Sequence, residues 1–137
     1  MQIKSRKNPI VICLLSFFLF VSNLGAEEFD ITATEIVVDK ENEIIVGKGS
    51  VLVHDSEGKL IYADKITYEK SRKFLLAEGK VKIIDNEGNI LKTKKATYDK
   101  INEIIVTYNS TELILKEGYK LNTKNILYRT TKKTLTS

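Results

Sequence analysis

Few residues of this chain combine into a group that could do chemistry. His54 is the only histidine among 137 residues, and it stands beside Asp55. Nucleophilic catalysis also needs an activated nucleophile. The single cysteine, Cys13, lies in an apolar run near the N-terminus, and no serine-centred motif accompanies the His–Asp pair. His54 falls at the end of a predicted strand, where a surface role fits better. We therefore expect no enzyme activity and no catalytic residue.

Two acidic turns resemble the start of a calcium loop. They read "DSEGK" from residue 55 and "DNEGN" from residue 85. Both lack the further acidic position and the distal glutamate that such a loop requires. A hairpin turn explains them better, because Asp opens a turn and Gly supplies a positive φ. We expect neither a metal site nor a cofactor.

Charge is distributed unevenly along the chain. Residues 27–58 hold two basic and nine acidic side chains (2 − 9 = −7), whereas residues 119–137 hold five basic and no acidic ones. A solvated outer face explains this pattern. Alternatively, the opposite ends steer association, or Lys120, Lys124 and Arg129 meet lipid phosphates. No basic–aromatic cluster lies outside 119–133, so the sequence predicts no binding of nucleic acid.

Residues 1–26 predict a Sec-type signal peptide. Lys4, Arg6 and Lys7 precede an apolar run over 10–21, and small residues end in Ala26. This order of charge, apolar run and small residue is typical of a secretory signal. The run is too short for a comfortable transmembrane helix, which needs about 20 apolar residues. A membrane anchor that is not cleaved is the alternative. The remaining domain, 27–137, lacks cysteine and is expected to be stabilised by burial and backbone pairing alone.

The exported part repeats itself every thirty residues without a gap. Gly58, Gly88 and Gly118 end the three full units. A fixed period of this kind predicts a stack of equivalent units. The units are 29–58, 59–88, 89–118 and the partial 119–137.

Each unit predicts two strands rich in β-branched residues, at about 30–38 and 43–54 in the first unit. In 59–88 the apolar alternation changes phase at Asp64–Lys65, which indicates a β-bulge. A second phase change precedes Val51, at Gly47 and Gly49. Each strand is therefore expected to bend once at a fixed depth. A stack of such strands is an all-β, folded-over sheet with its apolar face inside.

Apolar side chains on the inner face either fill a core or line a groove for lipid, and both roles need the same residue types. Ile31, Leu91, Val106 and Leu113 are expected to point inward. The candidates for lining a groove are Ile36, Val38, Ile44, Val46, Val51, Val53, Ile61, Ala63, Ile66, Tyr68, Phe74, Leu76, Val81, Ile83, Tyr98 and Ile104.

The segment "YADKITYEKSRKFLLAEGKVKIID" (62–85) resembles the repeat of the OstA-like family. The pattern is A-D-x-x-x-Y, a short turn, an apolar strand and then x-G-x-V. Ala63, Asp64, Tyr68, Gly79 and Val81 occupy its positions. The family includes LptA-like periplasmic proteins of lipopolysaccharide transport and the N-terminal domain of the outer-membrane assembly protein LptD, which the wording of the turns resembles more. In 89–118 the match weakens, because Thr93, Lys94, Asn109 and Thr111 replace the pattern residues.

This resemblance implies an open β-jellyroll, or β-taco, in the periplasm. It would shield the lipid A acyl chains of lipopolysaccharide without catalysis, and stack edge to edge with LptA-like or LptC-like domains. The final unit has no closing turn, which predicts a partner there or a longer protein associated with the outer membrane. The alternative is an exported structural β-solenoid or adhesin-type repeat with a packed interior.

Overall fold

The computed structural model describes residues 28–131 and 134–137, which form an all-β structure. The predicted signal peptide at 1–26 lies outside this part. Within it no helix is long and apolar enough to span a bilayer. Its strands are β1 (Phe29–Thr32), β2 (Glu35–Asp39), β3 (Ile44–Asp55), β4 (Leu60–Glu69), β5 (Phe74–Ile84), β6 (Ile90–Asp99), β7 (Ile104–Tyr108), β8 (Thr111–Ile114), β9 (Lys120–Thr123), β10 (Leu127–Arg129) and β11 (Thr134–Thr136).

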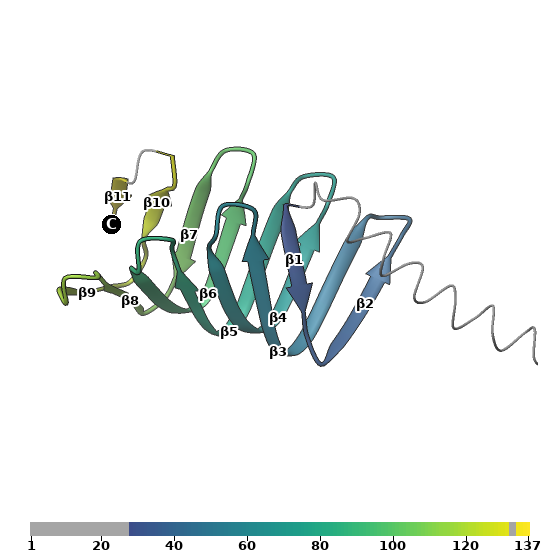
Figure 1. Cartoon of the computed structure of the whole chain (residues 1–137), viewed down its shortest axis with the longest axis horizontal. Coiled ribbons are helices and arrows are strands. Elements are labelled where there is room, and N and C mark those ends of the chain that lie inside the picture. The colour runs from purple at the N-terminus through teal and green to yellow at the C-terminus, as the bar shows by residue number, and fades with distance from the viewer. Residues whose placement is uncertain (1–27, 132–133) are drawn as a thin grey trace, which may run out of the picture.

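All eleven strands belong to one antiparallel sheet that is folded along its middle into two walls (Figure 1). Wall A consists of β2, residues 44–48, 65–69, 74–78 and 95–99, then β7, β10 and β11. Wall B consists of β1, residues 51–55, 60–63, 81–84 and 90–93, then β8 and β9. The walls meet along the bottom of Figure 1, and their hairpins lie toward the top, at the side that we call the mouth.

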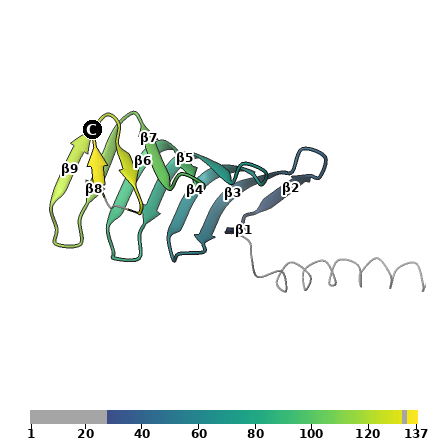
Figure 2. The ribbon, with the colours of Figure 1, turned by 90° about the horizontal axis from the view of Figure 1, so that it is seen from above.

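The sheet does not close into a barrel. Strands follow one another along the long axis, from β1 and β2 at one end to β8 and β9 at the other (Figure 2). Among the strands of the described residues, β2 pairs only with β3, and β9 pairs only with β8. The structure therefore has the open all-β architecture that the repeat predicts, with a free edge at each end.

Two kinds of corner fold the sheet. In β4 the ladder shifts by one residue between Tyr62 and Lys65, which confirms the bulge predicted at this point. In β5 two consecutive residues, Gly79 (φ 81°) and Lys80 (φ 45°), both adopt the left-handed conformation. The same pair of conformations recurs thirty residues before and after, at 49–50 and 109–110.

The two-residue corner corrects part of the predicted inner face. A one-residue bulge reverses which side of the strand faces inward, but two extra residues preserve it. Ile45 therefore points inward with Val51, and its partner across the ladder is the buried Tyr68. The prediction was wrong for the residues one position away, which lie half-buried on the outer face: Ile44, Val46, Phe74, Leu76, Ile104 and Val106.

Both acidic segments form hairpin turns, as predicted. The backbone N–H of Lys59 donates to Asp55 Oδ1 over 3.1 Å, and that of Asn89 donates to Asp85 Oδ1 over 2.9 Å. Gly58 and Gly88 have φ of 92° and 94°, a conformation that glycine adopts without strain. These turns place the ends of β3 and β5 at the mouth of wall B.

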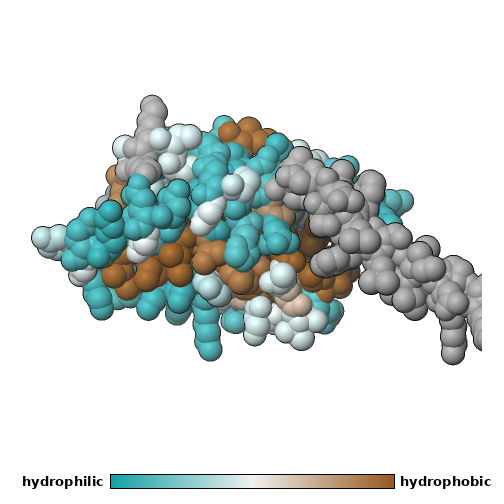
Figure 3. All heavy atoms as spheres, in the orientation of Figure 1, coloured by the Kyte–Doolittle hydropathy of each residue, from teal (hydrophilic) through white to brown (hydrophobic). Residues whose placement is uncertain are grey.

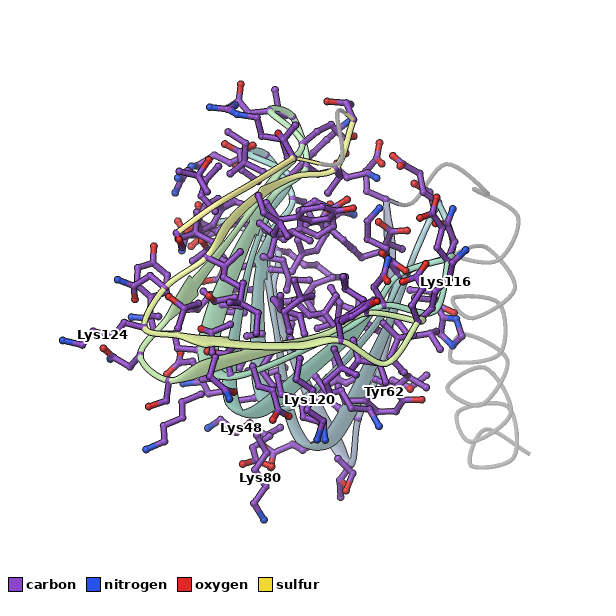
Figure 4. All side chains as sticks on the ribbon, turned by 90° about the vertical axis from the view of Figure 1, so that its left-hand side faces the viewer. Lys48, Tyr62, Lys80, Lys116, Lys120 and Lys124 are labelled. Atoms are coloured by element: carbon purple, nitrogen blue, oxygen red, sulfur yellow. The ribbon has the colours of Figure 1, made fainter. Side chains whose placement is uncertain are left out.

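The core fills the space between the walls, where side chains from both meet (Figure 4). The labelled side chains Lys48, Lys80 and Lys124 point away from it. The buried apolar residues are Phe29, Val51, Val53, Ile61, Ala63, Ile66, Tyr68, Leu75, Ala77, Val81, Ile83, Leu91, Ala96, Tyr98, Ile105, Leu113 and Ile126.

Candidate functional site

An apolar cavity of about 180 Å³ lies between the walls near the C-terminal end of the sheet. β5, β6 and β8 of wall B supply one side, and β7, β10 and β11 of wall A supply the other. The lining residues are Lys59, Ile83, Asp85, Glu87, Asn89, Leu91, Ile105, Leu113, Leu115, Tyr128 and Leu135. The polar members come from the hairpin turns of wall B, so the cavity is apolar inside and polar at its rim.

This cavity has the chemistry of a hydrocarbon site. Ligand pockets for drug-sized molecules measure about 300–1,000 Å³, so a volume of about 180 Å³ accommodates only a short hydrocarbon segment. No group of three or more metal-binding side chains occurs among residues 28–131 and 134–137. The apolar side chains of the lining offer dispersion contacts.

Toward the N-terminal end the interior is filled by aromatic side chains. Phe29, the first residue of β1 on wall B, crosses to two tyrosines of wall A. Its ring lies 4.9 Å from that of Tyr68 and 5.5 Å from that of Tyr98, both nearly perpendicular to it. Edge-to-face pairs of this kind stabilise a core by about 0.5–1.5 kcal/mol beyond the area that they bury.

Above these rings a group of four charged residues and one tyrosine joins the two walls across the mouth. We call Asp55, Glu57, Lys59, Tyr98 and Lys100 the mouth cluster. The Tyr98 hydroxyl of wall A donates to Asp55 Oδ2 of wall B over 3.0 Å. Lys100 Nζ lies 3.4 Å from the same oxygen and 2.6 Å from Glu57 Oε1. Lys59 Nζ lies 3.5 Å from Asp55 Oδ2. The side chain of Asp55 is fully buried.

The contacts within the mouth cluster shift the pKa values of its members. Burial opposes the ionisation of Asp55, but backbone N–H donors and the ammonium groups of Lys59 and Lys100 outweigh it and hold its pKa below the ordinary value. Burial likewise opposes the charge on Lys100, but its hydrogen bond to Glu57 and the charge of Asp55 raise its pKa. Burial and the Asp55 charge raise the pKa of Tyr98. At neutral pH the Asp55 carboxylate and the Lys100 ammonium group are therefore charged, and the Tyr98 phenol is neutral.

Comparison with known proteins gives a result at the level of structure. No protein-family profile and no curated protein matches the sequence. A crystal structure of LptH from Pseudomonas aeruginosa, described as the LptA-homologous periplasmic component of the lipopolysaccharide transport device, superposes with a TM-score of 0.70. The match covers 80% of each chain at 15% identity. The chain has the LptH fold. This confirms the predicted open β-jellyroll, while an identity of 15% shows the fold alone.

In this LptH-like sheet most of the predicted groove residues belong to the packed core. The members that are buried as predicted are Val51, Val53, Ile61, Ala63, Ile66, Tyr68, Val81, Ile83 and Tyr98. Of these only Ile83 lines the cavity. Whether any of them contacts lipid stays a prediction.

Ile36 and Val38 occupy the inner face but are not covered. Their ladder partners are Gly47 and Ile45, and directly paired residues share a face of the sheet. Because β2 is the last strand of wall A, no neighbour among residues 28–131 and 134–137 lies beyond it, and Ile36 and Val38 are 45% and 48% exposed. The inner face of the LptH-like sheet thus continues as open apolar surface at this end.

Sequence reasoning missed both the mouth cluster and much of the cavity lining. The local pattern places Asp55 and Lys59 in a turn, and nothing local connects them with Lys100, 45 residues from Asp55. Leu115 and Leu135 lie in short segments after the last strong repeat. A usable signal was the alternation of Leu113 and Leu115, which continues the inward phase of β8.

Proposed function

We propose that this chain is a non-catalytic periplasmic module of lipopolysaccharide transport and outer-membrane assembly. It shelters part of a lipid A acyl chain in the apolar cavity and stacks with similar domains. We choose lipopolysaccharide as the ligand because the fold is similar to that of LptH. The apolar cavity is the observation on which the proposal depends. The signal peptide predicted at 1–26 is consistent with export.

Shelter from water suffices for such a carrier. Burying one methylene group contributes about 0.8 kcal/mol. Several methylene groups among Leu91, Ile105 and Leu113 would therefore be held by a few kcal/mol, which is reversible. An acyl chain of about a dozen carbons needs more space than 180 Å³, so the rest of it would extend through the polar rim or along the next module.

Stacking would use the two ends of the sheet. At one end β2 carries three consecutive exposed apolar residues, Ile36, Val37 and Val38, between Glu35 and Asp39. At the other end β9 exposes Leu121, which follows Lys120, and β11 exposes Leu135. Unpaired edge strands accept a further strand. An LptA-like or LptC-like domain, or a second copy, is the proposed partner.

A photo-crosslinking experiment tests the lipid site. Benzoylphenylalanine is placed at Leu91, whose side chain lines the cavity, or at Lys92, the next residue of β6, which faces outward. Leu113 and Glu112 form a second pair on β8. We expect lipopolysaccharide adducts in cells at positions 91 and 113 and none at 92 and 112.

Equal capture at both members of a pair, or capture at none of the four positions, would refute lipid shelter. The structural solenoid would then explain the packed N-terminal half better. The similarity of the turns to the N-terminal domain of LptD further suggests that the module belongs to a longer outer-membrane assembly protein. If the module is part of a longer protein, an immunoblot of the native protein with an antibody raised against residues 28–131 would show a mass well above 15.6 kDa.

A further inference from the structure

We propose that the side chain of Tyr98 blocks the space between the two walls and so sets how much hydrocarbon the cavity holds. We call this side chain the bar. This inference rests on the proposed lipid-carrier function. It assigns a length-determining role to a residue of the mouth cluster and confines the ligand to the C-terminal half of the fold.

The position of Tyr98 relative to the cavity supports this role. Along wall A the inward residues Tyr128, Ile105 and Tyr98 follow one another as ladder partners. Tyr128 and Ile105 line the cavity, whereas Tyr98, the next residue of this row, does not, so the cavity stops short of it. The phenol of Tyr98 reaches Asp55 on wall B, so its side chain spans the space between the walls. On wall B the cavity ends at Lys59, which also contacts Asp55.

Several contacts hold this bar in place. The ring of Tyr98 packs against Phe29 on its N-terminal side. The ammonium groups of Lys59 and Lys100 lie 5.7 and 5.5 Å from the ring centroid, within the range of cation–π attraction. Tyr98 is 1% exposed. A side chain fixed by this many partners does not yield to a hydrocarbon chain that arrives from the C-terminal end.

Removing the bar should lengthen the cavity. Tyr98→Leu keeps an apolar side chain in the core but does not span the walls. Asp55 would retain both lysines and the backbone N–H groups of its turn as partners. The space beyond is bounded by Phe29, so the gain is limited to the difference in volume between the tyrosine and leucine side chains. Tyr98→Phe keeps the ring in place and is the matched control.

The experiment measures the binding of n-alkyl maltosides with four to twelve carbons by calorimetry, below their micelle concentrations. In the wild-type chain each added methylene should tighten Kd about fourfold until the chain fills the cavity, after which Kd stays constant. We expect this plateau at the same length in Tyr98→Phe and at chains about one carbon longer in Tyr98→Leu.

An unchanged plateau in a folded Tyr98→Leu variant would overturn the role of Tyr98 while leaving the carrier function intact. If the wild-type chain binds no alkyl maltoside at any length, the proposed carrier function fails instead, and the inference with it.

A measurement on the wild-type chain keeps the proposal falsifiable if Tyr98→Leu does not fold. Nuclear Overhauser contacts from the chain protons of bound decyl maltoside are expected at the methyl groups of Leu91 and Leu113. None are expected at Val53, which lies beyond the bar. Contacts at Val53 of similar strength would refute the proposal.

Discussion

Replacing Asp55 with asparagine tests whether the mouth cluster holds the two walls together. The amide keeps the shape of the side chain and its Oδ1 acceptor for the turn N–H groups. It removes the negative charge that faces Lys59, Lys100 and the Tyr98 hydroxyl. Two buried ammonium groups would then share the remaining carboxylates.

The expected loss of unfolding free energy is about 3 kcal/mol. Removing one partner of a buried ion pair costs about 3–5 kcal/mol, since the other charge is left without compensation. The low end applies because Glu57 and Glu103 still lie 2.6 and 3.7 Å from Lys100 Nζ. A matched control is Glu69→Gln, which breaks the exposed pair with Arg72 and should cost less than about 1 kcal/mol.

Urea unfolding at pH 7, followed by circular dichroism, gives both free energies. The double variant Asp55→Asn/Lys100→Met should lose less than the sum of the two single variants, because it removes charges of opposite sign together. A loss below about 1 kcal/mol for Asp55→Asn, or strict additivity in the double variant, would refute the electrostatic account of the mouth.

Three further outcomes are expected. Because the pKa of Asp55 is lowered on folding, its contribution to stability is present above about pH 4 and lost as pH falls through the folded-state pKa; between pH 4 and 2 stability should fall less steeply in Asp55→Asn than in the wild type. In urea unfolding, Gly79→Ala should lower the free energy of unfolding by at least about 1 kcal/mol more than Gly88→Ala. A Cβ at 79 would meet a carboxylate of β4, whereas one at 88 meets nothing nearer than 3.8 Å. Equal losses in the two variants would contradict this. Thr107→Val should cost about 1–3 kcal/mol in thermal unfolding, because the buried Thr107 hydroxyl accepts the N–H of Ile126 over 2.9 Å, whereas Thr107→Ser should be nearly neutral.

The repeat, the strands, the hairpin turns and the one-residue bulge were predictable because each is encoded within a few residues. The phase of the two-residue corner was not. Its second left-handed residue is Ser50, Lys80 or Ser110, and none of these residue types indicates a positive φ. A pattern of apolar residues therefore fixed the existence of the bend and left open which side of the strand faces inward beyond it.

Departures from the repeat in its third unit became interpretable only in three dimensions. Thr93, Thr107 and Thr111 meet at the corner beneath β10. The Thr111 hydroxyl lies 2.7 Å from that of Thr107 and 3.3 Å from that of Thr93. Here the N–H of Ile126 needs an acceptor, since the chain leaves the ladder between β9 and β10. The threonine hydroxyls of this unit therefore provide hydrogen-bond partners for one another and for the buried N–H of Ile126, and buried polar groups need such partners.

The mouth cluster illustrates a different limit. Tyr98 and Asp55 are 43 residues apart, and each has a sufficient local explanation as a strand residue or a turn residue. Their approach depends on the twist of the sheet and on its fold, which bring the ends of β3 and β6 together. Contacts of this range do not follow from local patterns.

Half-buried apolar residues also form a row on the outer face of wall B, through the ladder partners Leu60, Ile84, Ile90 and Ile114. A band of apolar residues is visible across the surface in Figure 3. Both faces of the strands are therefore partly apolar, which explains why apolar content alone did not distinguish inner from outer positions.

The paired left-handed corner has a consequence for how such a chain can vary in length. Deleting Lys80 alone would turn Val81 and Ile83 to the solvent and bring Lys82 and Ile84 into the interior, for the rest of that strand. Whole units of thirty residues carry their own corners and leave every other orientation unchanged. Proteins of this architecture can therefore gain or lose complete thirty-residue units during evolution. Insertions and deletions of single residues near the corner are expected to be removed by selection.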